Sequence, residues 1–249
     1  MKATLQWYCY ILVSFIFTAQ ASAQITLAEL ESIKQAFYAE YGPEITRSGG
    51  RLSINKAPDS MPLIWWETPY VNASYVTRLE NGVREHNLYV MGGYARLPGM
   101  TVDGVIGVLC HELAHGIGGA PHKLREPDQF GEVSTEAQSD YWGYGQCLPR
   151  MFKRIPPQKS PQAATPQIDR ICQRRSGPVV DINTCYRFFD VMEIERDYFA
   201  NHIVHRGLTD FETPDRTIAD RVNLEPDYYP SLQCRIDTMI EAFFQNPRP

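Results

Sequence analysis

Hydrophobic residues recur every three or four positions over residues 26–41, with polar residues between them. This period places the apolar side chains on one face, which predicts an amphipathic helix that ends at Gly42-Pro43. Farther along the chain, shorter runs alternate apolar and polar residues or are continuously apolar, as strands are. We expect strands over residues 51–56, 63–67, 71–79 and 83–91. Asn81-Gly82 between the last two predicts a tight hairpin.

The helical period returns after Gly92-Gly93, which breaks the last strand. Thr101 is a typical N-cap residue, and the helix after it has an apolar face made of Val102, Val105, Ile106, Leu109 and Leu113. Glycines at 116, 118 and 119 are expected to end this helix. Further helices are expected from residue 134 or 135 to about 152, over 183–205 and over 232–244.

The N-terminal segment has the pattern of a secretory signal peptide. Lys2 precedes an apolar run over residues 7–19, and the small residues Ala21-Ser22-Ala23 follow it, which predicts cleavage between Ala23 and Gln24. An uncleaved membrane anchor is the alternative, but the run is short for a bilayer span. We therefore expect a secreted or periplasmic chain with no stable membrane anchor after cleavage.

The remaining pattern divides the chain into a core, a connection and a helical end. Four prolines between residues 156 and 166 lie among Gln, Ser and Ala residues, which predicts a linker or long loop over 153–168. Residues 24–152 are expected to form an α+β core, in which a small, mostly antiparallel sheet packs on the helix after Thr101. Residues 169–249 are expected to form a helical C-terminal subdomain.

Composition excludes some functional classes. The 249 residues are 43% hydrophobic and 12% aromatic, as in globular proteins. Lys+Arg number 24 against 29 Asp+Glu, for a net charge of -5 without a long basic run, so nucleic-acid binding is not expected. Cys9 lies in the signal segment, so five of the six cysteines remain in the mature chain. An exported chain can join them as disulfides, and no C-x-x-C pair indicates a cysteine-ligated metal.

The segment from Cys110 to His115 carries the main candidate chemistry, because it contains the pattern H-E-x-x-H. In a helix, His111 and His115 at positions i and i+4 share a face and can bind one zinc ion. Glu112 lies beside them and can take a proton from an attacking water molecule. The alternative is a pair of surface histidines around a glutamate.

A catalytic zinc ion usually has a third protein ligand, and two residues are candidates. In one class of zinc protease, a third histidine follows the second by six residues, but that position is Pro121 and His122 is one residue late. Glu136 is favoured instead, because Asp140 lies at i+4 on the same helix face. Asp140 can accept the free ring N–H of His111 or His115. A solvated acidic face is the alternative for this pair.

H-E-x-x-H followed by a helix with E-x-x-x-D resembles the gluzincin metallopeptidases. The sequence around these motifs is similar to that of a group of bacterial exported proteins. The similar positions are Gly92-Gly93, residues 101–103, 110–115, 118–121 and 136–141, Cys147 and a C-terminal segment at 229–238. The resemblance implies a zincin-like fold, His111, His115 and Glu136 as zinc ligands, and Glu112 as catalyst. The chain departs at residues 114–116, where Ala-His-Gly replaces an expected Gly-His-His.

This resemblance implies an exported zinc endopeptidase that acts on a peptide or protein substrate. It also implies that the strand over 83–91 is an exposed edge to which a peptide can add, while the alternative from the sequence is an ordinary sheet strand. The alternatives are a zinc amidase that acts on cell-wall peptide and a non-catalytic binding protein with the same fold. Candidates for stabilising the transition state lie in the C-terminal half, where spacing does not select among His202, His205, Tyr228, Tyr229 and Arg235.

Two cysteines lie on the expected ligand helices. A bridge between Cys110 and Cys147 would tie these helices together, while the alternatives are two buried thiols or a pair with Cys234. Cys172 and Cys185 can close a small loop of their own.

Overall fold

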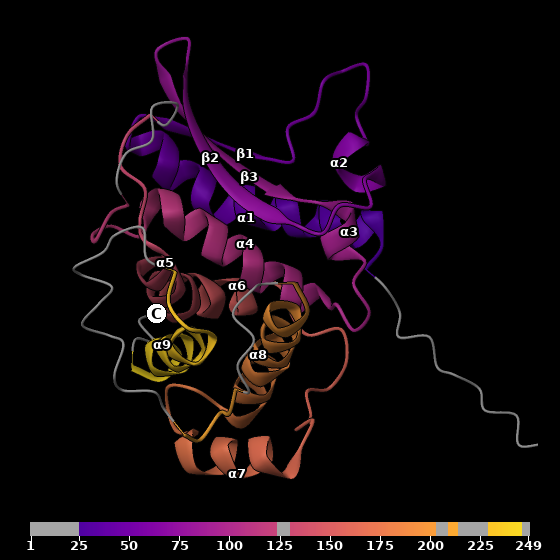
Figure 1. Ribbon diagram of the computed structural model, residues 1–249, viewed down its shortest axis with the longest axis vertical. Helices are drawn as coiled ribbons and strands as arrows, with labels where there is room; N and C mark the ends of the chain where they lie inside the picture. Colours follow the sequence, from indigo (N-terminus) through magenta and orange to yellow (C-terminus); the bar gives the residue numbers. More distant parts are fainter. Residues whose placement is uncertain (1–24, 124–129, 203–208, 214–228, 246–249) are drawn as a thin grey trace, which may run out of the picture.

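The computed structural model describes residues 25–123, 130–202, 209–213 and 229–245. The fold is mixed α+β, with a small sheet and several helices (Figure 1). The strands are β1 Gly50–Ile54, β2 Ala73–Glu80 and β3 Val83–Val90. The helices are α1 Leu27–Arg47, α2 Ile64–Glu67, α3 Gly92–Ala95, α4 Val102–Ile117, α5 Glu136–Trp142, α6 Leu148–Arg154, α7 Pro166–Arg175, α8 Ile182–His202 and α9 Leu232–Gln245, with a π-helical turn, η1, at Gly143–Cys147. The proposed signal segment lies outside the described residues.

The three strands are ordered β1-β3-β2, so the central strand is β3 and not an edge as expected. β3 pairs in parallel with β1 and antiparallel with β2, which makes the sheet mixed. The expected hairpin is confirmed: Asn81 and Gly82 have φ values of 53° and 79°, the left-handed conformation that this turn requires. In this order β3 pairs with β1 on one side and with β2 on the other, so β2 is an edge strand.

Two of the differences from the sequence prediction concern the helices α1 and α2. Helix α1 does not end at Gly42-Pro43 but continues to Arg47, because Ile45 extends its buried face beyond Tyr41. Residues 63–67 were expected to be a strand and instead form the single-turn helix α2. Trp65 contacts Tyr89 of β3 with ring centroids 4.5 Å apart, and Trp66 packs against the hydrophobic core.

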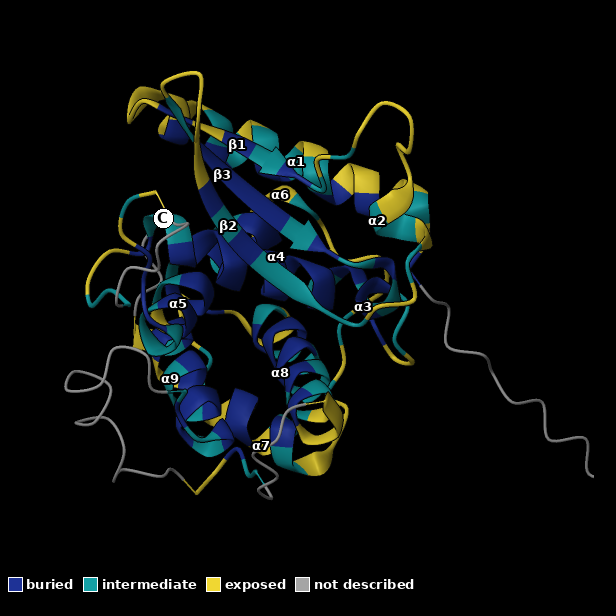
Figure 2. Ribbon diagram, turned by 45° about the horizontal axis from the view of Figure 1, so that its top comes forward, coloured by how far each residue is buried: buried dark blue, intermediate teal, exposed yellow. Residues whose placement is uncertain are grey.

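Helix α4 forms the centre of the molecule. It contacts β2 and β3 on one side and η1, α5 and α8 on others, and Figure 2 shows it almost wholly in the buried colour. One hydrophobic cluster extends from Ile25 to Phe243 and includes residues of α1, α4, α8 and α9. Residues 156–165 contain no helix or strand, and α7 begins at Pro166. Helix α9 packs against α5 and η1, so the C-terminal helix contacts the two elements that follow α4 in the chain.

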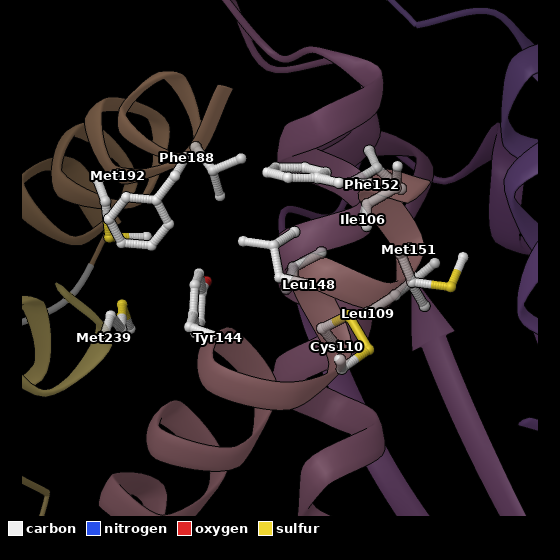
Figure 3. Packing of buried hydrophobic residues seen from close by; sticks show 14 of the residues in the cluster. Ile106, Leu109, Cys110, Tyr144, Leu148, Met151, Phe152, Phe188, Met192 and Met239 are labelled. Carbon is white, nitrogen blue, oxygen red and sulfur yellow. A yellow bond between two sulfur atoms is a disulfide. The ribbon is translucent and has the colours of Figure 1, made fainter. Parts of the chain in front are cut away.

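Both expected disulfides are present. Cys110 on α4 is bonded to Cys147 at the end of η1, close to Leu148 and Met151 in the core (Figure 3). Cys172 on α7 is bonded to Cys185 on α8, and Cys234 is buried and belongs to neither bond. The two disulfides fit an oxidising extracellular compartment. Within the described residues, no helix has the length and apolar composition needed to cross a membrane.

We expect the Cys110→Ser, Cys147→Ser double variant to lose about 4 kcal/mol of unfolding free energy, from the entropy of a loop of this size. The bond joins residues 37 positions apart, against 13 for Cys172–Cys185. Removal of the second bond by the matched serine pair is expected to lose about 3 kcal/mol. Denaturant unfolding of both variants measures these losses. An unchanged unfolding free energy in the Cys110 and Cys147 variant would contradict the prediction.

Candidate metal centre

Three ionisable residues lie in the last two turns of helix α4, after an apolar stretch from Gly104 to Cys110. Thr101 fixes the start of the helix, because its hydroxyl accepts a hydrogen bond of 3.1 Å from Gly104 N. His111, Glu112 and His115 are only 6–7% exposed. Burial of ionisable groups is unfavourable unless they are paired or bind a metal ion. Their burial therefore distinguishes this segment from a solvated helix face.

Glu136 approaches the two histidines from the first turn of α5, a helix capped by Thr135 as expected. Its Oε2 lies 3.2 Å from His111 Nε2, and its Oε1 lies 3.6 Å from His115 Nε2. One possible ligand atom from each of these three residues lies within 4.8 Å of the other two. The buried group of His111, His115 and Glu136 can therefore hold a metal ion.

The outer nitrogen of each imidazole faces a fixed acceptor. His111 Nδ1 lies 2.9 Å from Asp140 Oδ1, and His115 Nδ1 lies 2.8 Å from the carbonyl oxygen of Ser134. A carbonyl oxygen only accepts hydrogen bonds, so Nδ1 of His115 carries the hydrogen. Its Nε2 then presents a lone pair toward Glu136. Such outer hydrogen bonds orient histidine ligands and select the coordinating nitrogen, which makes the donor set suitable for a metal.

Arg235 connects helix α9 to this centre. Its guanidinium donates to both carboxylate oxygens of Asp140, at 2.7 and 2.8 Å, and also to the hydroxyl of Tyr229. The rings of Phe199 and Tyr229 lie 4.4 and 4.8 Å from the guanidinium carbon. Arg235 is 2% exposed, and its Nη2 lies 3.6 Å from Glu136 Oε2. The C-terminal helix therefore holds the acceptor of His111 in place.

These contacts shift the pKa values of the site. Burial opposes a charge on His111, but its hydrogen bonds to Asp140 and Glu136 prevail and raise the pKa to about 10. Burial lowers the pKa of His115 to about 3 and raises the pKa of Glu112 to about 7. Asp140 is also buried, yet Arg235 keeps the pKa of its carboxyl below the ordinary value. His111 thus lies between two carboxylates, and its Nε2 is the atom that would bind a metal ion.

A cavity of about 590 Å³ opens beside the metal-ligand group. Its walls include His111, Glu112, His115 and Glu136, together with residues 70–75 at the start of β2 and residues of α8 and α9. Glu112 therefore shares one solvent space with the possible metal ligands. A molecule in this cavity can contact the group and the carboxylate of Glu112 at the same time.

The structure separates the two candidates for a third ligand. His122 is not in the metal-ligand group found among the described residues, and its Nδ1 lies 3.3 Å from the exposed carboxylate of Glu132. Of the candidate stabilising residues, His202, Tyr229 and Arg235 line the cavity, and Arg235 is already bonded to Asp140. Residues 205 and 228, the candidates His205 and Tyr228, lie outside the described residues.

Sequence reasoning missed Lys123, whose Nζ lies 2.5 Å from Glu136 Oε1 and which lines the cavity. It also missed η1. At Gly143, the first residue of this turn, an added Cβ would lie 3.0 Å from the carbonyl oxygen of Cys110. Glycine therefore permits the close approach of η1 to α4. No spacing rule indicates either feature, because each depends on contacts between separate elements.

The structure also gives a reason for the unusual Ala-His-Gly sequence at residues 114–116. A Cβ on Gly116 would lie 2.7 Å from both His86 Nδ1 and Tyr75 Oη, which contact each other at 2.9 Å. A histidine at position 116 would displace this pair. Glycine at this position avoids that displacement.

Comparisons of this chain with protein-family models, with curated proteins and with solved structures found no match.

Proposed function

We propose that this protein is an exported zinc-dependent metallopeptidase of the gluzincin kind, which hydrolyses peptide bonds. The observation that carries the proposal is the buried group of His111, His115 and Glu136, with Glu112 beside it in the same cavity. Two imidazole nitrogens and one carboxylate oxygen form a ligand set that catalytic zinc sites use, with a further position left for water or substrate. Packing of a small sheet against α4 supports a zincin-like arrangement.

In the proposed mechanism, a bound zinc ion would acidify a water molecule and polarise the scissile carbonyl. Glu112 accepts the proton of the attacking water and later delivers it to the leaving amine. Asp140 and the Ser134 carbonyl keep the imidazoles in the orientation that the ligand set needs. Arg235 fixes Asp140, so its proposed part is positioning.

The position of β2 supports a peptide as the substrate. β2 is an edge strand, and residues 70–75, which include its start, line the cavity. Farther along, Phe130 N donates to the carbonyl oxygen of Thr77 at 3.4 Å, which covers part of this edge. An extended peptide could add to the cavity-facing stretch by main-chain hydrogen bonds. The proposed export is supported by the two disulfides and by the signal pattern of the sequence.

Removal of the metal tests the proposal. We expect dialysis of the purified protein against a zinc chelator to abolish cleavage of an unstructured protein such as casein. Addition of stoichiometric Zn²⁺ is expected to restore it, because the metal would polarise the scissile carbonyl. Cleavage that continues after metal analysis shows the zinc to be gone would refute the zinc-dependent mechanism. Mg²⁺ serves as the control ion, since it binds histidine-rich sites poorly.

A further inference from the structure

The cavity beside the metal-ligand group continues along α4 toward its N-terminus. Val108, one turn before His111 and Glu112, lines the cavity together with Tyr94 of α3, Tyr144 of η1 and Glu195 of α8. We call this end of the cavity the Glu195 pocket and define it by these four residues and Tyr198. It adjoins the groups that would perform catalysis, so a side chain of a bound substrate can enter it.

Glu195 places a buried carboxylate in this pocket. The residue is 3% exposed, and its Oε1 accepts a hydrogen bond of 2.9 Å from the hydroxyl of Tyr144. Glu195 forms no ion pair in the part of the chain that the structure describes. His111 and Arg235 act on it only at longer range, because His111 faces Asp140 and Glu136 and the guanidinium of Arg235 is bonded to Asp140. A buried carboxylate without a cation is unfavourable, and burial accordingly raises the pKa of Glu195.

Tyr94 adds a second polar group that lacks a partner. Its side chain is completely buried, and its hydroxyl has no hydrogen-bond partner within the described residues. The ring lies edge-on to Tyr198, with centroids 4.8 Å apart. Most buried hydroxyl groups are hydrogen-bonded, so the hydroxyl of Tyr94 is a second polar group at this cavity that the described residues leave unsatisfied. Glu195 and Tyr94 both line the same cavity, and both can accept hydrogen bonds.

We propose that the Glu195 pocket binds a positively charged nitrogen of the substrate and so gives the enzyme a preference for basic peptides. This inference rests on the proposed peptidase function. The nitrogen would donate hydrogen bonds to Glu195 and Tyr94. A lysine side chain, an arginine side chain and an N-terminal amine share this chemistry. A bound cation would give the buried carboxylate a direct partner, at the cost of its own desolvation.

Matched peptides test the charge requirement. Blocked peptides with one internal lysine, arginine or norleucine are compared, since norleucine has the lysine chain without its ammonium group. A fourth peptide has norleucine and a free amino terminus. We expect the zinc-loaded protein to show a kcat/KM about tenfold to a hundredfold higher for a cationic peptide than for blocked norleucine. A higher kcat/KM for the peptides with internal lysine or arginine would identify a side chain as the source of the nitrogen. A higher kcat/KM for the norleucine peptide with a free amino terminus would identify the terminal amine.

Glu195→Gln is the decisive variant, because glutamine still accepts the hydrogen bond from Tyr144 but has no charge. It should remove the preference for the cationic peptide, because kcat/KM for that peptide falls much more than kcat/KM for the blocked norleucine peptide. Tyr94→Phe should reduce the preference about threefold to tenfold. The control is Glu193→Gln, which removes the same charge from α8 at a residue that lines a neighbouring cavity. Equal losses on all peptides in Glu195→Gln would assign Glu195 a purely structural role and overturn the inference.

Equilibrium binding separates this inference from the proposed function. The same peptides are titrated into the protein in the presence of chelator, so that no hydrolysis is needed. The cationic peptide should bind about tenfold tighter than blocked norleucine, and Glu195→Gln should abolish the difference. Equal binding by the unmodified protein overturns the pocket assignment, even if zinc-dependent cleavage is present. Selective binding without zinc-dependent cleavage supports the pocket and refutes the peptidase.

Discussion

Replacement of Glu112 by glutamine is expected to lower kcat for peptide hydrolysis by about 10²–10⁴-fold, the usual contribution of a general acid–base group. Glutamine has nearly the shape of glutamate but cannot accept the proton of the attacking water. Glu112 is not in the metal-ligand group, so the variant should keep its zinc. Steady-state cleavage of a fluorogenic peptide, with zinc content measured on the same samples, tests both expectations.

The control for this variant is Glu193→Gln, which changes the same functional group on α8 at a residue that does not line the cavity of Glu112. It should cleave at the rate of the unmodified protein. If Glu112→Gln cleaves as well as the unmodified protein at equal zinc loading, the proposed mechanism is wrong. A joint loss of zinc and activity would also contradict it, because Glu112 would then act in metal binding.

The local parts of the site were predictable from sequence because a helix fixes the spacing of its own residues. The period over residues 102–113 predicted a buried helix, and Thr101 marked its start, as the structure confirms. The i and i+4 relation likewise placed Glu136 and Asp140 on one face, and the structure brings both to His111. The Asn81-Gly82 turn was predictable for the same reason, since two residues set its conformation.

The parts that join distant segments were not predictable. Arg235 binds Asp140 across 95 positions of sequence, and Glu195 meets Tyr144 across 51. Neither contact has a periodic signal, because each depends on how α8 and α9 pack behind η1. The parallel pairing of β1 with β3 is a similar case, since the hydrophobic alternation of a strand does not specify its neighbour. The sequence pattern therefore indicated the helices that carry the proposed ligands. Tertiary packing determines which residues orient those ligands, and the pattern does not show it.

The second large effect is expected at Glu136. We expect Glu136→Gln to weaken zinc binding by more than about a hundredfold, because the loss of a partner outside the ligand set already costs about 10–100-fold. The variant exchanges a charged ligand for a neutral amide while it keeps a group of similar size beside Lys123. Competition with a chromophoric chelator measures the affinity, and circular dichroism checks that the fold is retained.

His122→Ala is the matched variant, since it removes the other candidate for the third ligand. His122 Nδ1 faces Glu132, whose side chain is 78% exposed, so its loss should change the zinc affinity by no more than about twofold. A loss of affinity only in His122→Ala would overturn the choice of Glu136. It would also require the segment around Pro121 to move toward α4, because in the structure Glu136 already lies between the two imidazoles. The pair of variants thus decides which of two separate segments completes the metal site.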